Sequence, residues 1–304
     1  MAAKSDSPTA KAKELLRSLD GRMALDDLVS AHVAAVIDAT TPEKMSLDAQ
    51  IDAEAIAKRV AEYEAATGPL ACSAALIARW GLPEHLPSLT TALSRLGDAP
   101  ADDTSGTNGW LALKWLPLFL VQYSAGVAAV WADRYDVVAA MHRAPTGRRS
   151  RYEESPFALA RGLARANSAG RDEVFRALPD FERRRSAGAS DYLFDFSKRT
   201  LPALLSTGAD VGAAFDRFEI LDTMMIMSRD TEKRRVTPGR GMFVWKAVNS
   251  PGSDPLSAVE AEAKLEGDSW APARAGLFGG STANFLELTA RFRSEYLKRA
   301  GYEW

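Results

Sequence analysis

A glycine-rich stretch near the C-terminus has the residue types of an anion-binding turn. It reads Arg-Ala-Gly-Leu-Phe-Gly-Gly-Ser over 274–281 and leads directly into the last predicted helix. Free N–H groups and the helix dipole at such a helix start attract anions. No lysine follows the glycine pair and no predicted strand precedes it in a βαβ unit, so neither phosphate-binding fingerprint of nucleotide enzymes fits. Two interpretations stay open: a turn that only docks the last helix, and an anion site formed by Arg274, Gly279, Gly280, Ser281 and Thr282.

Basic residues form a second candidate site. They alternate with the aromatic residues Phe243 and Trp245, as on surfaces that bind nucleic acid. A solvated charge run explains the same pattern, because cations suit the C-terminal ends of helices. The candidate nucleic-acid contacts are Arg229, Lys233, Arg234, Arg235 and Arg240.

Residues that could act as a nucleophile or bind a metal are isolated. His32, His85 and His142 have no His, Cys or carboxylate at the spacing of a helical metal site, and His32 is interpreted as a core residue. Cys72 is the only cysteine and lies among small residues, which indicates helix packing rather than a reactive thiol. No Gly-x-Ser-x-Gly or Ser-x-x-Lys motif occurs. We therefore predict no catalytic residue, cofactor or metal ligand.

Charged residues stand among core-type residues in Phe215–Leu221. We expect Arg217, with Asp216 or Glu219, to form partly buried ion pairs that link helices. Such pairs specify geometry more often than they catalyse. Arg134 is interpreted in the same way.

The composition is that of a globular chain with a continuous core. The 304 residues are 46% hydrophobic and 26% charged, with a formal net charge of −2. This charge gives no global attraction to nucleic acid or anionic membranes. The N-terminus lacks the apolar core of a signal peptide, and a single thiol fits a reducing compartment, so a cytoplasmic location is expected.

Apolar periodicity predicts an all-α protein: an irregular multi-helix bundle or array around a long apolar helix over 110–142. Gly68-Pro69 is expected to break a helix starting near 48, and a β-prone run predicts a minor β element near 240–248. Further helices are predicted over 8–19, through 25–36, and over 70–80, 84–96, 153–167, 171–186, 190–206, 208–229, 255–266 and a C-terminal helix through 285–296.

The basic linker 147–151 is the best candidate for a domain boundary. We expect a tail and short helix over 1–22, an N-terminal helical subdomain over 23–146 and a C-terminal one over 152–304. Residues 115–132 carry no charge, about the minimum for a membrane span. A buried central helix is favoured instead, because Pro117 and Gln122 lie within the run and Lys114 and Asp133 bracket it.

Four segments together resemble an uncharacterised helical region of bacterial antiphage and conflict proteins. In those proteins the region follows an effector domain, such as a sirtuin-like or Toll/interleukin-receptor-like NAD-consuming domain. The segments are Arg59–Leu70 leading to Trp80-Gly81, Tyr123–Tyr135, Phe215–Leu221, and Arg274–Ser281 after Trp270–Pro272.

The resemblance implies an accessory module rather than a catalyst. No effector domain is expected in this chain, so a partner would supply the activity in trans, and no catalytic residues can be carried over. The sequence thus predicts a non-enzymatic interaction or regulatory subunit with a protein partner. Two alternatives remain: a nucleic-acid-binding protein that uses 229–246, and an enzyme of dispersed residues with an anionic substrate at 274–282.

Overall fold

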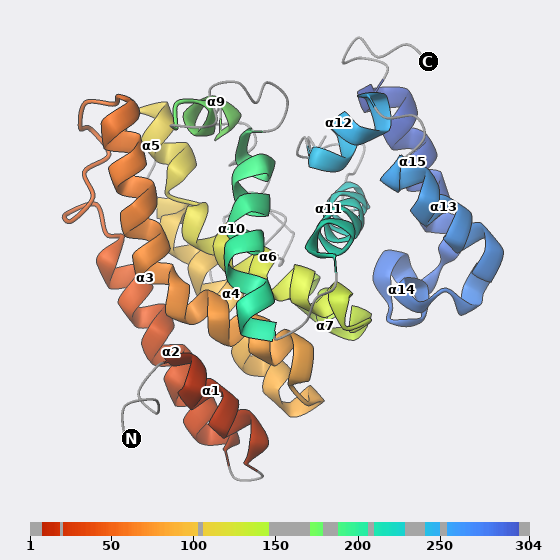
Figure 1. The fold of residues 1–304 in the computed structure, drawn as a ribbon, viewed down its shortest axis with the longest axis horizontal. Helices are drawn as coiled ribbons and strands as arrows, with labels where there is room; N and C mark the ends of the chain where they lie inside the picture. The colour runs from red at the N-terminus through yellow and green to blue at the C-terminus, as the bar shows by residue number, and fades with distance from the viewer. Residues whose placement is uncertain are drawn as a thin grey trace.

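The computed structural model describes residues 8–18, 21–102, 106–145, 171–178, 188–205, 210–228, 241–249 and 254–297. Every regular element in these ranges is helical, which confirms the predicted all-α array (Figure 1). The helices are α1 (Pro8–Arg17), α2 (Arg22–Ala39), α3 (Ala53–Trp80), α4 (Leu86–Asp98), α5 (Asn108–Leu113), α6 (Leu116–Trp131), α7 (Tyr135–His142), α9 (Arg171–Arg176), α10 (Gly188–Leu205), α11 (Val211–Met227), α12 (Met242–Asn249), α13 (Pro255–Glu266), α14 (Ala271–Arg274) and α15 (Thr282–Phe292). Short helical turns lie at Pro83–His85, Ala99–Asp102, Gly267–Ser269, Leu277–Gly280 and Arg293–Leu297.

α6 is the centre of the array, as its apolar composition predicts. Every residue from Leu116 to Val130 is buried. α3, α10 and α11 pack around it. A Cβ atom at Gly126 would lie 2.1 Å from Cε2 of Phe218 on α11, so this close approach of α6 and α11 requires glycine.

The apolar stretch predicted as one helix over 110–142 is three helices. α5 ends at Leu113, and α6 begins at Leu116 with Pro117 in its first turn, where a missing N–H removes no helical hydrogen bond. Asp133 has a φ of 54° and turns the chain into α7. Apolar residues continue across both turns, so hydrophobicity alone does not reveal them.

The predicted helix break at Gly68-Pro69 is wrong, because α3 contains Pro69 in its interior. Proline removes the amide donor to Ala65 and crowds the Cβ atom of the residue before it. Gly68 has no Cβ atom, so that crowding is relieved. The second half of α3 is buried and packs on α6, and this tertiary contact keeps the helix continuous. α3 also starts later than predicted, after Asp52.

The predicted β element near 240–248 is wrong as well: Met242–Asn249 is α12. Phe243 and Ala247 lie four residues apart and both are buried, which is the spacing of a helix face. The short apolar run satisfies both helix and strand patterns, and its burial against neighbouring helices selects the helix.

The stretch Asn108–Trp131 is the one candidate membrane span in the described part of the chain, with 24 residues and a mean hydropathy of 1.3. The fold buries 94% of its apolar window. This burial favours the predicted core helix over a span, because a core helix has the same length and composition.

One cluster of buried hydrophobic side chains extends from Ala12 on α1 to Leu297 near the C-terminus. α6, from the predicted N-terminal subdomain, packs on α10 and α11 of the predicted C-terminal one. The helices predicted over 190–206, 208–229 and 255–266 are confirmed as α10, α11 and α13. The predicted linker 147–151 and helix 153–167 lie outside the described residues.

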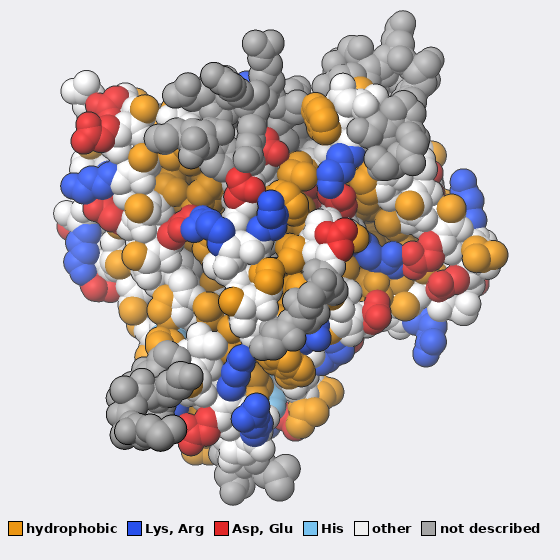
Figure 2. All heavy atoms as spheres, viewed as in Figure 1, with side chains coloured by type: hydrophobic (Ala, Val, Ile, Leu, Met, Phe, Trp, Pro, Cys, Tyr) orange, Lys and Arg blue, Asp and Glu red, His pale blue; other side chains and the backbone are white. Residues whose placement is uncertain are grey.

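Charged side chains of both signs are mixed on the face shown in Figure 2, and hydrophobic side chains show between them. This mixture agrees with the near-zero net charge. Figure 1 shows α11 between the N-terminal helices and the group α12–α15. Polar side chains on α11 can therefore contact both groups of helices.

Candidate functional site

α11 carries three acidic residues at intervals of three: Asp216, Glu219 and Asp222. The helix begins where the carboxylate of Asp210 accepts a hydrogen bond from the N–H of Gly212 at 2.7 Å. An interval of three residues in a helix with 3.6 residues per turn places the carboxylates on one side, each rotated from the last. They therefore face different neighbours.

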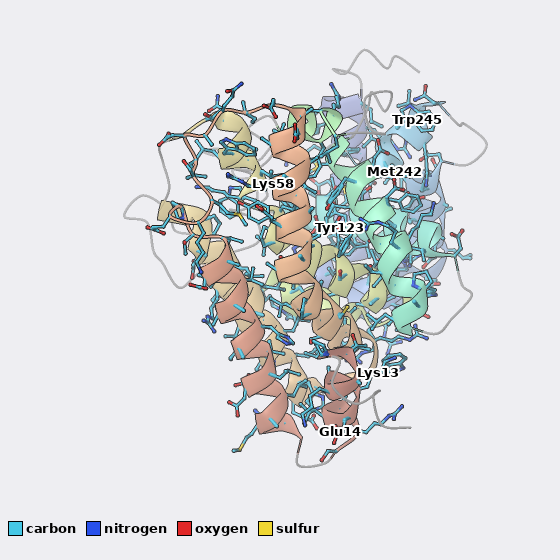
Figure 3. All side chains as sticks on the ribbon, turned by 60° about the vertical axis from the view of Figure 1, so that its left-hand side comes forward. Lys13, Glu14, Lys58, Tyr123, Met242 and Trp245 are labelled. Atoms are coloured by element: carbon cyan, nitrogen blue, oxygen red, sulfur yellow. The ribbon has the colours of Figure 1, made fainter. Side chains whose placement is uncertain are left out.

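Glu219 lies in a closed hydrogen-bond network in the interior. Its Oε1 atom accepts from Ser190 on α10 at 2.6 Å and from Tyr123 on α6 at 3.1 Å, and its Oε2 atom accepts from the N–H of Met242 at 2.8 Å. Figure 3 labels Tyr123 and Met242, which come from α6 and from the start of α12. Burial raises the pKa of Glu219 to about 7. The network joins four helices, and Glu219 is 2% exposed and lines neither of the two cavities described below.

Asp222 links α11 to α6 and α7. Its Oδ1 atom accepts a hydrogen bond from Gln122 at 2.7 Å and lies 3.1 Å from Nε2 of His142. All three side chains are buried. This contact pairs His142 on α7 with Asp222 on α11, and His142 lines neither of the two cavities described here.

Asp216 faces a large cleft, which is the candidate functional site. The cleft has a volume of about 990 Å³ and lies between the α6–α7 turn, α11 and α13. Its apolar wall includes Val130, Ala214 and Val259, and its polar wall consists of carboxylates. Among the described residues, six acidic side chains and one basic side chain line it: Asp133, Asp210, Asp216, Asp254, Glu262, Glu266 and Arg217.

Two ion pairs in the wall of the cleft, Arg217–Glu262 and Lys246–Asp216, fix its helices. Arg217 on α11 donates two hydrogen bonds to Glu262 on α13, at 2.5 Å and 2.6 Å, and also lies over the ring of Tyr135. Arg217 holds the pKa of Glu262 below its usual range, and burial raises the pKa of Tyr135 to about 12. Arg217 links helices as expected, but its partner is Glu262 on α13 and not Asp216 or Glu219.

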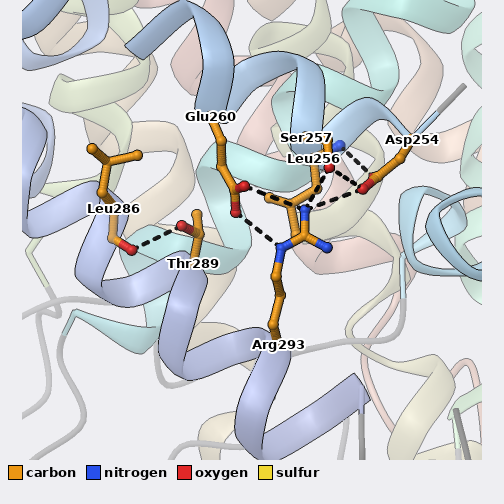
Figure 4. A network of polar contacts seen from close by, with 7 residues as sticks. All are labelled: Asp254, Leu256, Ser257, Glu260, Leu286, Thr289 and Arg293. Carbon is orange, nitrogen blue, oxygen red and sulfur yellow. Dashed lines mark hydrogen bonds and ion pairs between the residues drawn. The ribbon is translucent and has the colours of Figure 1, made fainter. Parts of the chain in front are cut away.

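A third ion pair holds the start of α13 (Figure 4). Arg293, just after α15, binds Asp254 at 3.1 Å and Glu260 at 3.1 Å. Burial opposes ionisation of Asp254, but hydrogen bonds from Ser257 and Arg293 hold its pKa below the usual value. The carboxylate also caps α13 through the N–H of Leu256 at 2.9 Å.

Asp216 is the group best placed to meet a ligand. Its side chain is 10% exposed, its Oδ2 atom binds Lys246 on α12 at 2.6 Å, and its Oδ1 atom has no hydrogen-bond partner in the described part of the chain. Burial raises the pKa of this carboxyl, and Lys246 opposes the shift. Among the described residues no ion pair neutralises Asp133, Asp210 or Glu266. The cleft therefore has an excess of negative charge and attracts cations.

Apolar contacts of Phe278 with neighbouring aromatic rings hold the predicted anion-binding turn in place. Phe278 is buried, with a φ of 57°, and stacks near Trp270 and Phe285. Ser281 caps α15, as expected, by accepting from the N–H of Asn284 at 3.3 Å. Thr282 is buried and donates to the carbonyl of Gly267, whereas Gly279, Gly280 and Arg274 are exposed. The anion site thus stays a prediction, and its two hydroxyls are already engaged.

The predicted nucleic-acid contacts Arg229, Lys233, Arg234, Arg235 and Arg240 lie outside the described residues. Phe243 is buried, so it is not a stacking surface, whereas Trp245 on α12 is 45% exposed (Figure 3). Lys246 is engaged with Asp216.

The remaining candidates for chemistry are dispersed. No group of three potential metal ligands occurs within the ranges that the structure describes. The ring of His85 accepts from the N–H of Leu82 at 3.0 Å and orders a turn. Arg134 binds Asp136 and the carbonyl of Gly81, in agreement with its predicted structural role.

Sequence reasoning missed the cleft, because its acidic residues come from three separate segments between 133 and 266. The one usable signal was the set of charges in Phe215–Leu221. It indicated buried polar contacts but not which of them would face a cavity.

No protein-family model, curated protein or solved structure matches this chain. Any inference about its function therefore rests on the residues of this chain alone.

Proposed function

We propose that this chain is a non-enzymatic interaction protein whose acidic cleft receives a basic segment of a partner protein. Asp216 is the observation that carries the proposal. Its carboxylate lines the cleft beside Asp133, Asp210 and Glu266, which no ion pair neutralises among the described residues, so a cation that enters is stabilised by the excess negative charge.

Lysine and arginine side chains fit both walls of the cleft. Their methylene stems suit the apolar wall at Val130, Ala214 and Val259, and their charged ends suit the carboxylates. The volume of about 990 Å³ is at the upper end for small-molecule pockets, which favours several side chains of a chain segment over a single small cation. Phosphate groups would be repelled here, so the cleft does not favour nucleic acid.

A binding role accounts for the polar residues better than catalysis does. Arg217, Glu262 and Asp254 are held in ion pairs that fix α11, α13 and α15. Glu219 has a pKa near neutrality, as a general base would, but it is enclosed by Ser190, Tyr123 and the backbone of Met242.

The resemblance to accessory regions of bacterial antiphage proteins suggests the kind of partner. We propose an effector enzyme that acts in trans in the cytoplasm, regulated through a basic segment in the cleft.

The proposal is tested by purification of the tagged chain from its native cells with a matched pair of variants. Ala258→Lys with Glu266→Lys places two cations on the cleft side of α13, where both residues line the cleft. Ala290→Lys with Glu287→Lys makes the same charge change on α15, at exposed positions outside the cleft. A stoichiometric partner that is lost only from the cleft variant, and whose contact maps to a Lys- or Arg-rich segment, would support the proposal. A partner retained equally by both variants would refute it.

A further inference from the structure

A second, smaller cavity lies between α3 and α10, away from the acidic cleft. Its volume is about 340 Å³. Ala61, Ala65 and Gly68 are spaced four and three residues apart, so they form one stripe of α3 and leave space. Phe196, Leu201 and Leu204 of α10 form the apolar wall opposite.

Ser124 gives this cavity an unsatisfied polar group. It comes from α6, lines the cavity, and is 2% exposed. Its hydroxyl has no hydrogen-bond partner among the residues that the structure describes. Buried hydroxyls nearly always have a partner, because leaving one unpaired is unfavourable. A bound molecule that exchanges a hydrogen bond with Ser124 would remove this deficit.

The charges at the cavity neutralise each other. Arg199 binds both oxygens of Glu64, at 2.7 Å and 3.3 Å, and the hydroxyl of Tyr192 also donates to Glu64. Burial raises the pKa of the Cys72 thiol, which lines the same cavity and therefore adds no charge at neutral pH. The two charged residues that line the cavity in the described part of the chain are thus paired with each other, and the nearby ammonium of Lys13 donates to the carbonyl of Leu204 at 3.0 Å, so the cavity favours a neutral molecule.

We infer that this cavity binds a small, neutral, largely apolar molecule with a single hydrogen-bonding group directed at Ser124. Its volume admits roughly a dozen non-hydrogen atoms, the size of a phenol or an indole. This ligand site stands independently of the acidic cleft, since the two cavities share no lining residue.

The inference is tested by fluorine NMR titration with 5-fluoroindole, 4-fluorophenol and 4-fluorobenzyl alcohol. Ala65→Leu fills the cavity from an exposed helical position, and Ala53→Leu is the matched control at an exposed position of the same helix. Ser124→Ala removes the hydroxyl alone and leaves no partner unsatisfied.

At least one probe should bind the natural chain saturably, with a dissociation constant of roughly 10–1000 µM. Ala65→Leu should abolish this binding, Ser124→Ala should weaken it severalfold, and Ala53→Leu should leave it unchanged. Absence of saturable binding by all three probes would overturn the inference. So would binding that Ala65→Leu leaves intact, or a loss of thermal stability in Ser124→Ala that shows its hydroxyl to be paired.

Discussion

Replacing Glu219 with glutamine should remove the part of the pH dependence of stability between pH 5 and pH 8 that this carboxyl contributes. Burial raises the pKa of this carboxyl from 4.5 to about 7 in the folded chain. The folded state therefore holds the proton more tightly than the unfolded state does. The resulting stabilisation is fully present below about pH 4.5 and is lost as the pH rises through 7.

The difference of about 2.5 pKa units corresponds to about 3 kcal/mol at most, of which most falls between pH 5 and pH 8. Because Glu219 is fully buried, solvent screens this effect little. Glutamine keeps the network: its carbonyl oxygen accepts from the N–H of Met242, and its amide group donates to the hydroxyls of Ser190 and Tyr123.

Urea denaturation at several pH values between 5 and 8 measures the effect. The natural chain should lose about 2–3 kcal/mol of unfolding free energy relative to Glu219→Gln as the pH rises across this range. Glu14→Gln, at an exposed residue of α1 (Figure 3), is the control and should run parallel to the natural chain. A difference between the natural chain and Glu219→Gln that stays constant with pH would show that Glu219 does not change protonation, and would refute the reasoning.

Three further predictions follow from the packing. Gly126→Ala places a methyl group 2.1 Å from the Phe218 ring and should destabilise the chain by about 1–3 kcal/mol in urea denaturation, with partial recovery when Phe218→Leu is added; equal stability would contradict the close helix approach. Arg293→Ala removes both ion pairs to α13, so hydrogen exchange of α13 should accelerate more than that of α3; unchanged exchange would show that the network does not hold α13. Asp52→Ala removes the cap on the N–H of Ala55 and should cost about 1 kcal/mol, and Asp52→Asn should retain most of the stability.

Helix positions were predictable where the chain carries clear start and stop residues. α13 lies where the sequence placed it, because Asp254 caps it, Pro255 begins it and Gly267 follows its end. The apolar character of α6 likewise predicted its central position. These signals are local and need no knowledge of neighbours.

Other elements depend on contacts between residues that are far apart in the sequence. Pro69 lies inside a helix because the second half of α3 is buried against α6, and α12 is helical because Phe243 and Ala247 face the core. The partners of Glu219 come from α6, α10 and α12, so no spacing in the sequence could indicate them. The acidic cleft is assembled in the same way from segments far apart.

The central claim is that the cleft binds cationic peptide segments. Fluorescence anisotropy with a labelled peptide of alternating lysine and alanine tests it most directly, with a glutamate–alanine peptide as the comparison. We expect the basic peptide alone to bind the natural chain, with affinity that falls as salt is raised. Ala258→Lys with Glu266→Lys should weaken this binding roughly tenfold or more, and Ala290→Lys with Glu287→Lys should weaken it much less. Equal affinity in both double variants, or no binding of the basic peptide at low salt, would contradict the account.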